Sequence, residues 1–251
     1  MPREKLAPAP MAGAEGEIMA DNVHSAVGSA RPRDLGGLFK WLLEAHPRDA
    51  LRLLCGARLD GAGVIHDEPP EPLEQHDRQC SGAFLVLRGD GVPTDVYHIV
   101  VQVERTEGFQ EWMVTCWSSL ALKYSRSGHR IHQVVLWPLG NGYPGRFRRD
   151  RSRLEYRSVS VPDDPDPGML LASPLAPLAL WSQKPPPDLV ERVVDQIAAT
   201  TVLEEQLVQV ELCMLAGGDL AAEVLDALGR KGLNDVVEQA RSDREIEQGR
   251  L

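Results

Sequence analysis

A run of arginines in the middle of the chain carries the clearest binding chemistry in the sequence. Between residues 123 and 157 there are nine basic residues against two acidic ones, Asp150 and Glu155. Clustered cations can neutralise the phosphates of a nucleic-acid backbone. A run of like charges is equally typical of a solvated surface, so both interpretations stay open. The phosphate hypothesis assigns the contact to Arg146, Arg148, Arg149 and Arg151.

A second group of polar side chains lies on one expected strand, residues 97–104. Side chains alternate between the two faces of a strand. One face of this strand would carry His98, Val100, Gln102 and Glu104, and the other Ile99, Val101 and Val103. Glu104 lies roughly 7 Å beyond Gln102 along such a strand. A lone histidine on this face is more often a core side chain than a catalytic one.

The segment after this strand is expected to form a helix that packs against it. Apolar residues recur at spacings of three and four through residues 109–124, which predicts an amphipathic helix docked on the strand. Its stripe consists of Phe109, Trp112, Met113, Cys116, Trp117, Leu120 and Tyr124. Strand and helix are therefore expected to form one packed unit.

The neighbouring segments predict an α/β body with a mixed sheet flanked by helices. Two helices are expected early, one capped by Asp34 and one over residues 46–55, followed by a loop with a short extended piece at 63–65. Further strands are expected at 83–88, 132–137 and 154–161, the last near an edge. The 83–88 and 97–104 strands should form an antiparallel hairpin, and the 97–104 and 132–137 strands should pair in parallel.

Both ends of the chain have a different composition from this body. Residues 1–31 lack apolar periodicity and predict a disordered tail, and no segment is apolar enough for a membrane span. Residues 169–178 are broken by prolines and should lie irregularly across the core. Four helices are then expected over 187–201, 202–215, 219–230 and 233–250. The predicted organisation is a tail at 1–31, an α/β domain at 32–183 and a helical region at 184–251 that offers a surface for self-association.

Charge and cysteine usage exclude several classes of protein. The formal net charge of −10 argues against a protein that binds nucleic acid over its whole surface. The four cysteines, Cys55, Cys80, Cys116 and Cys213, include no C-x-x-C pair, so reduced thiols are expected and a structural zinc site is not. A soluble cytoplasmic protein without a membrane partner is the resulting expectation.

The order and spacing of six pieces resemble a known family. Residues 38–43, 49–54, 98–102, 113–124 and 134–136, with a tail ending at 247–250, look like the Rpn/YhgA-like transposases, the recombination-promoting nucleases of the PD-(D/E)XK superfamily. The resemblance runs from about residue 32 to the end. It implies a restriction-endonuclease-like core, DNA as substrate and Mg²⁺ as cofactor. In that family, carboxylates on two neighbouring strands hold the cation that activates water for phosphodiester hydrolysis.

The chain departs from the family pattern at the positions that would hold the metal. The family's aspartate before the first hairpin strand corresponds to Gly82, its glutamate two residues before Gln102 corresponds to Val100, and its basic helix residue corresponds to Trp112. Gln102 is retained, and Lys40 matches the family's first-helix lysine by position. A conventional metal site cannot be assembled from glycine, valine and tryptophan.

Two interpretations of the remaining acids stay open. A displaced site would use Gln102, Glu104 and Asp77 for catalysis, with Glu104 and Asp77 as metal ligands. Alternatively, Glu104 leaves the sheet into solvent and Asp77 lies in a loop. The function hypotheses are therefore an endonuclease with impaired catalysis, an inactive nuclease-fold module that binds nucleic acid or protein, and a structural, self-associating protein.

Overall fold

The computed structural model describes residues 34–67, 80–88, 92–124 and 128–248. Residues Pro32–Leu251 form one compact unit. The tail predicted for residues 1–31 lies outside the described residues. The hydrophobic core of this unit continues from the sheet into the C-terminal helices, and the predicted boundary near residue 184 stays a prediction.

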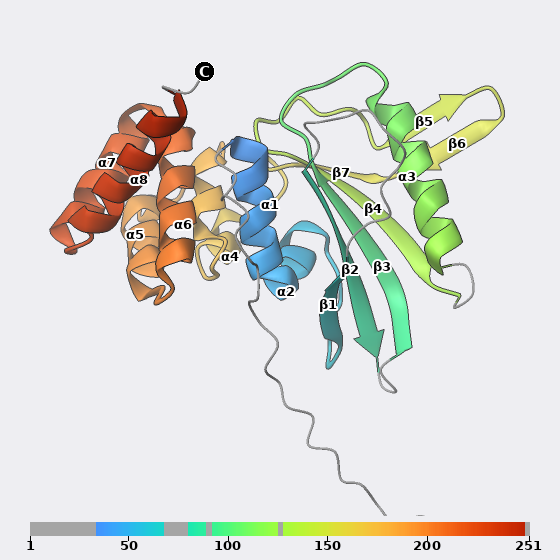
Figure 1. The fold of residues 1–251 in the computed structure, drawn as a ribbon, viewed down its shortest axis with the longest axis horizontal. Coiled ribbons are helices and arrows are strands. Elements are labelled where there is room, and N and C mark those ends of the chain that lie inside the picture. The colour runs from blue at the N-terminus through green and yellow to red at the C-terminus, as the bar shows by residue number, and fades with distance from the viewer. Residues whose placement is uncertain (1–33, 68–79, 89–91, 125–127, 249–251) are drawn as a thin grey trace, which may run out of the picture. The chain divides into compact units, whose positions relative to one another are not determined.

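The described strands form a five-stranded mixed sheet and a separate two-stranded one (Figure 1). The strands are β1 (Gly63–Asp67), β2 (Cys80–Arg88), β3 (Val92–Val101), β4 (Arg130–Trp137), β5 (Arg146–Arg149), β6 (Ser152–Glu155) and β7 (Arg157–Ser160). In the larger sheet the order is β1-β2-β3-β4-β7. The predicted antiparallel hairpin, β2–β3, and the predicted parallel pair, β3–β4, are both confirmed.

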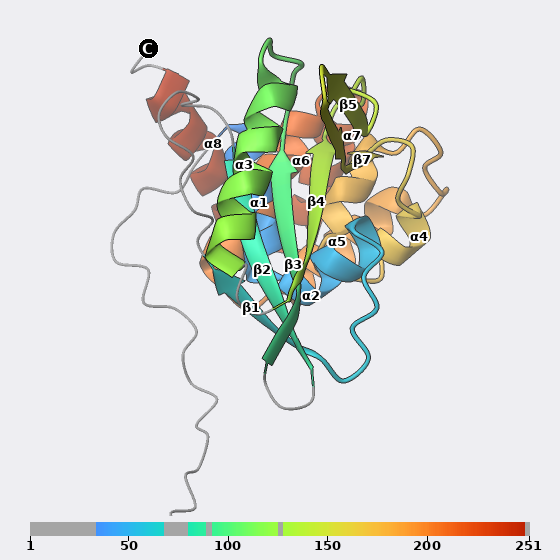
Figure 2. The same ribbon diagram turned by 90° about the vertical axis from the view of Figure 1, so that its right-hand side faces the viewer.

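Helices cover the two faces of the larger sheet differently. Helix α3 (Phe109–Tyr124) lies across one face, and α1 (Leu35–Ala45) lies on the other side together with the C-terminal helices (Figures 1 and 2). Strand β3 supplies both interfaces because its side chains alternate: Ile99 joins the core under α1, whereas Val100 joins the cluster under α3. A mixed α/β fold is thus confirmed.

The α1 side holds the larger core. Asp34 caps α1 by accepting a hydrogen bond from the backbone N–H of Gly37 at 2.6 Å, as predicted. The next expected helix is a short turn, α2 (Pro47–Asp49), that runs into the π-helix η1 (Ala50–Leu54). Beyond β7 the chain contains α4 (Pro167–Leu170), the 3₁₀-helix η3 (Ala176–Trp181), α5 (Leu189–Ala199), α6 (Leu203–Ala216), α7 (Gly218–Arg230) and α8 (Asn234–Gln248). The four predicted C-terminal helices are confirmed.

Several predicted elements differ from the observed ones. Strand β3 ends at Val101, so Glu104 follows the strand instead of extending its polar face. Residues 154–161 do not form one strand, because the chain breaks at Tyr156 between β6 and β7. The irregular 169–178 segment contains helical turns that bury Leu170 and Ala176. On α3, Trp117 was expected in the buried stripe but is 45% exposed.

The buried thiols agree with the prediction of reduced cysteines. Cys55, Cys116 and Cys213 are free and buried, and burial raises the pKa of each thiol to about 12. A thiol with so high a pKa remains protonated at neutral pH and is a poor nucleophile. These three residues are therefore packing groups of the core.

A buried carboxylate ties β3 to β4 near the start of their parallel pairing. Asp95 is almost fully buried, and its Oδ1 lies 2.8 Å from His132 Nε2 and 3.1 Å from Arg130 Nε. Thr94 Oγ1 donates to Asp95 Oδ2 at 3.1 Å. Burial alone raises the pKa of Asp95, but the hydrogen bonds from His132 and Thr94 and the charge of Arg130 outweigh it, so the pKa is lowered.

We expect Asp95→Asn to lower the free energy of unfolding at pH 7 by about 2 kcal/mol, because it weakens charge-assisted hydrogen bonds to a buried group. A lowered folded-state pKa means that the ionised carboxylate stabilises the fold above about pH 5, and that this contribution is lost as the pH falls below about 4. Urea denaturation at pH 7 and pH 3 measures both effects. Asp188→Asn, which alters an exposed ion pair with Arg192, is the control and should change stability by less than about 0.5 kcal/mol. An equal loss in the two variants would contradict the role of Asp95.

Candidate functional site

Of the predicted displaced site the structure describes Gln102 and Glu104, and it places these two side chains in different surroundings. Gln102 is buried at the end of β3, whereas Glu104 is exposed in the loop before α3. Asp77 lies outside the described residues. In the described part of the chain, no group of three or more His, Cys, Asp or Glu side chains is arranged to hold a metal ion.

Gln102 organises the loop after β3. Its Nε2 donates to the backbone carbonyl of Glu104 at 2.6 Å and lies 3.5 Å from Thr106 Oγ1. Its Oε1 is buried and has no hydrogen-bond partner among the described residues. The Oε1 atom of Gln102 could therefore accept a hydrogen bond or contact a cation. The carboxylate of Glu104 does not lie with it, because Gln102 contacts the main-chain oxygen of Glu104 and the Glu104 side chain is exposed.

The two positions that correspond to the family's carboxylates face opposite sides of the sheet. In the β2–β3 register Gly82 pairs with Ile99, and Ser81 pairs with Val100. Directly paired residues of antiparallel strands point to the same face. Gly82 therefore faces α1, and Val100 faces α3 within an apolar cluster that includes Phe109, Met113, Val135 and Trp137. Carboxylates at 82 and 100 would be separated by the sheet, so these positions do not fit a shared Mg²⁺ ion.

A carboxylate from α1 occupies the space beside Gly82. A Cβ added to Gly82 would lie 3.4 Å from Glu44 Oε1. That oxygen also lies 3.1 Å from His66 Nε2 and 3.7 Å from Lys40 Nζ. Lys40, the residue that matches the family's first-helix lysine, is thus part of a partly exposed ion cluster on the α1 face. Sequence patterns alone did not indicate this cluster, because His66 and Gly82 are distant in the chain from the α1 pair Lys40 and Glu44.

His98 and Trp112 belong to the packing between β3 and α3. His98 is buried beside Gln133, whose Nε2 donates to the carbonyl of Met113 at 3.0 Å. Burial lowers the pKa of His98 to about 4, so its imidazole is neutral at pH 7. The ring of Trp112 lies 6.3 Å from that of His98, and it packs on the apolar cluster under α3. The prediction of a core histidine at this position agrees with the observed burial.

The arginine run forms a two-stranded ribbon that the sequence patterns did not predict. Strands β5 and β6 pair antiparallel with Phe147 opposite Leu154, Arg148 opposite Arg153 and Arg149 opposite Ser152. Asp150 in the turn has a φ of 52°, a conformation that aspartate tolerates better than most residues. We call this hairpin, residues 146–155, the arginine ribbon.

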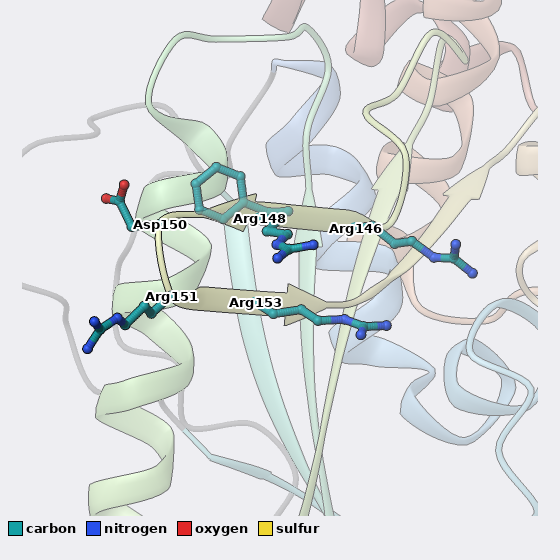
Figure 3. A pocket seen from close by; sticks show the side chains of 6 residues that line it. Arg146, Arg148, Asp150, Arg151 and Arg153 are labelled. Carbon is teal, nitrogen blue, oxygen red and sulfur yellow. The ribbon is translucent and has the colours of Figure 1, made fainter.

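The two faces of the arginine ribbon have different chemistry. Phe147 and Leu154 pack against the apolar cluster under α3, and Leu154 is buried. Because side chains alternate, Arg146, Arg148, Arg153 and Glu155 lie on the outer face. Figure 3 shows Arg146 and Arg148 on one strand, Arg153 on the other, and Asp150 with Arg151 at the turn. These side chains, with Phe147, line an open pocket of about 650 Å³.

Opposed like charges leave the outer face only partly neutralised. Arg148 lies directly opposite Arg153, an arrangement that destabilises a sheet unless an anion lies between the charges. Arg149 Nη1 lies 2.8 Å from Glu111 Oε1 on α3, and Arg153 pairs with Glu155. That pairing, with the charge of Arg146, lowers the pKa of Glu155. Among the described residues, no carboxylate forms an ion pair with Arg148 or Arg151.

The base of the ribbon is held firmly against the rest of the fold. The carbonyl of Gly145 accepts a hydrogen bond from the Tyr156 N–H at 3.0 Å. A Cβ at Gly145 would lie 2.1 Å from the carbonyl oxygen of Tyr156, so only glycine permits this approach. Gln110 Nε2 on α3 donates to the carbonyl of Arg146 and to Tyr156 Oη, both at 3.3 Å. The base of the ribbon is therefore linked to α3.

All four arginines of the phosphate hypothesis lie on the ribbon, and Arg153 completes the group. A sequence signal for this hairpin was present: residues 147 and 154 are apolar, and the residues between them are almost entirely charged. The predicted 154–161 strand obscured that signal, because it assigned β6 and β7 to one element.

Comparisons with known proteins neither identify the chain nor test the resemblance described above. No family model, no curated protein and no solved structure matches it. None of the described helices is long and apolar enough to cross a membrane.

The sheet register predicts which paired carboxylates could share a metal. We expect the double substitution Ser81→Asp with Val100→Glu to gain thermal stability with millimolar Mg²⁺, because both side chains face α3. Gly82→Asp with Val100→Glu should show no such gain, because its carboxylates face opposite sides. Both variants should be several kcal/mol less stable than the parent in EDTA, since each buries an unpaired carboxylate at position 100.

Thermal denaturation with and without Mg²⁺ makes this comparison. Both double variants carry the stability loss caused by the glutamate at position 100. The difference between their Mg²⁺-induced shifts in melting midpoint therefore reports which face of the sheet the second carboxylate is on. Equal stabilisation of both by Mg²⁺ would show that the β2–β3 register is not the one described.

Proposed function

We propose that this protein is a nucleic-acid-binding module, built on a core like that of the PD-(D/E)XK nucleases, which contacts phosphates through the arginine ribbon. The specific likeness to a restriction-endonuclease core rests on the order of elements in the sequence and belongs to this proposal. The mixed sheet with α1 and α3 on opposite faces is compatible with it.

The cross-strand pair of Arg148 and Arg153 carries the proposal. Two cations held opposite each other on an exposed ribbon repel, Glu155 offsets the charge of Arg153 alone, and a bound anion would remove the remaining repulsion. Arg146 and Arg151 extend the same positive surface toward the two ends of the ribbon. A chain of phosphates matches several such charges at once, whereas one small anion would match only one or two.

Binding is favoured over metal-dependent hydrolysis by the surroundings of positions 82 and 100. Val100 is fully buried against apolar side chains, and Gly82 faces the other side of the sheet beside Glu44. Restoring hydrolysis would therefore require more than one local substitution. The endonuclease hypothesis consequently depends on acids outside these positions, such as Glu104 and Asp77.

The nucleic-acid interaction should show the salt dependence of phosphate binding. We expect the full chain to bind duplex DNA at low salt, with log affinity falling linearly with log salt concentration. Replacing Arg148, Arg149 and Arg151 by Ala should reduce the magnitude of that slope by about 1 to 2, because each cation that meets a phosphate contributes about 0.9 and Arg149 is already paired with Glu111. Fluorescence anisotropy with a labelled duplex at several salt concentrations measures the slope.

A matched control separates the ribbon from net charge. Replacing Lys184, Arg230 and Arg241 by Ala removes the same charge from exposed sites in the C-terminal region and should leave the slope unchanged. Absence of binding at low salt would overturn the proposed function. Equal slopes for the two triple variants would remove the ribbon from it.

The parent protein should not respond to divalent metal through the family's positions. We expect titration with Mg²⁺ or Mn²⁺ to give no saturable heat and no rise in the melting midpoint, because a ligand that binds the native state must stabilise it. A saturable rise that Glu104→Gln abolishes would instead support the displaced site, and with it the endonuclease hypothesis.

A further inference from the structure

We propose that the arginine ribbon enters the major groove of duplex DNA, with Arg148 and Arg153 directed at base edges and Arg146 and Arg151 at the flanking phosphates. This inference rests on the proposed function and specifies both the nucleic acid and the mode of contact. It follows from the shape of the ribbon, the order of charges along it and its attachment to α3.

The ribbon has the form that a B-DNA groove accepts. Its paired strands are four residues long, which corresponds to about 13 Å. They form a two-stranded sheet of their own, and no strand of the larger sheet is hydrogen-bonded to either edge in the described part of the chain. The major groove of B-DNA, about 12 Å wide, admits a two-stranded ribbon. The major groove of an A-form RNA duplex is too deep and narrow for side chains to read.

The position of the ribbon leaves its outer face directed away from the body of the fold. Figures 1 and 2 show β5 and β6 at the periphery of the compact unit, beside α3 on the same side of the larger sheet. The inner face is occupied by the packing of Phe147 and Leu154 on the α3 cluster. Of its two faces, the arginine face is therefore the one that is open to a partner.

Contacts from both flanks connect the ribbon to the rest of the fold. Tyr143 lies just before the ribbon, and its ring stacks on that of Phe109 with centroids 6.0 Å apart. The Tyr143 hydroxyl donates to the carbonyl of Thr106 at 3.1 Å. The backbone carbonyl of Tyr143 accepts a hydrogen bond from Ser158 Oγ at 2.8 Å. Arg149 adds the ion pair with Glu111 on α3. A pre-positioned ribbon loses little conformational freedom on binding.

The order of charges along the outer face assigns the contacts. Arg148 and Arg153 are adjacent across the two strands in the middle of the face, where a ribbon in a groove meets the base edges. Arg146 lies at the open end and Arg151 at the turn, on opposite sides of this pair (Figure 3). Arginine forms two parallel hydrogen bonds to O6 and N7 of guanine, a contact that lysine reproduces less well.

Glu155 competes with DNA for Arg153. In the free protein it pairs with Arg153 and lies opposite Arg146. Entry into the groove would exchange this carboxylate for DNA, so the ion pair must break and weakens binding. Glu155→Gln should therefore strengthen duplex binding several-fold.

The test compares nucleic acids and groove ligands with the unmodified full chain. Anisotropy is measured with a duplex DNA, one of its single strands and a duplex RNA of the same sequence. We expect the DNA duplex to bind at least tenfold more tightly than the other two, on the order of a bidentate arginine contact. Methyl green, which occupies the major groove, should displace the protein, and the minor-groove ligand netropsin should not.

Two substitutions that preserve charge separate base contacts from phosphate contacts. Arg148→Lys should weaken duplex binding by roughly tenfold without changing the salt slope, because it keeps the charge and loses the bidentate geometry. Arg146→Lys, the matched control, should change affinity by less than about twofold, because a phosphate accepts either cation. Both sites are exposed, and circular dichroism confirms that each variant is folded.

The outcomes distinguish this inference from the function on which it rests. Equal binding to duplex and single strand, displacement by netropsin alone, or an unchanged affinity of Arg148→Lys would each overturn the groove contact while leaving phosphate binding in place. No binding to any of the three nucleic acids would overturn the proposed function itself. The competition with methyl green requires no variant, so the inference stays testable even if a substitution disrupts folding.

Discussion

The strict alternation of side chains along β3 is the constraint on which the rest of the structure depends. Ile99 and Val101 are buried on the α1 side, and Val100 is buried on the α3 side. A strand covered on both faces must satisfy two cores at once, and a shift by one residue would exchange them. The same alternation rules out a shared metal site at positions 82 and 100. Position 100 faces the apolar cluster under α3 and holds a valine, and the register places position 82 on the opposite face.

Helix α3 links this core to the candidate binding surface. Phe109 packs against Trp137 of β4 and against Tyr143, and the inner face of the arginine ribbon completes the same cluster through Phe147 and Leu154. Hydrophobic burial thus supports a surface whose own charges repel one another. This division of roles explains how an acidic protein, with a formal net charge of −10, can retain a local basic surface.

Buried polar side chains hold strands and loops of the fold in place. Asp95 joins β3 to β4 through His132 and Arg130, and Gln102 shapes the loop that leads into α3. Gln133 and His98 occupy the interior beneath α3. Burial keeps the imidazole of His98 neutral, so this pair adds no charge to the core.

Local patterns in the sequence determined the α/β class, the β2–β3 hairpin, the parallel β3–β4 pair and the four C-terminal helices, because periodicity and turn residues act over short distances. The arginines were also visible as a cluster. Only the tertiary structure decided that β3 ends before Glu104, that Gly82 and Val100 face apart, and that Glu44 lies beside Gly82. These features depend on strand register and on contacts between distant segments, which composition and spacing do not specify. The cross-strand pairing of Arg148 with Arg153 has the same origin, since it exists only once the turn at Asp150 has set the register of the ribbon.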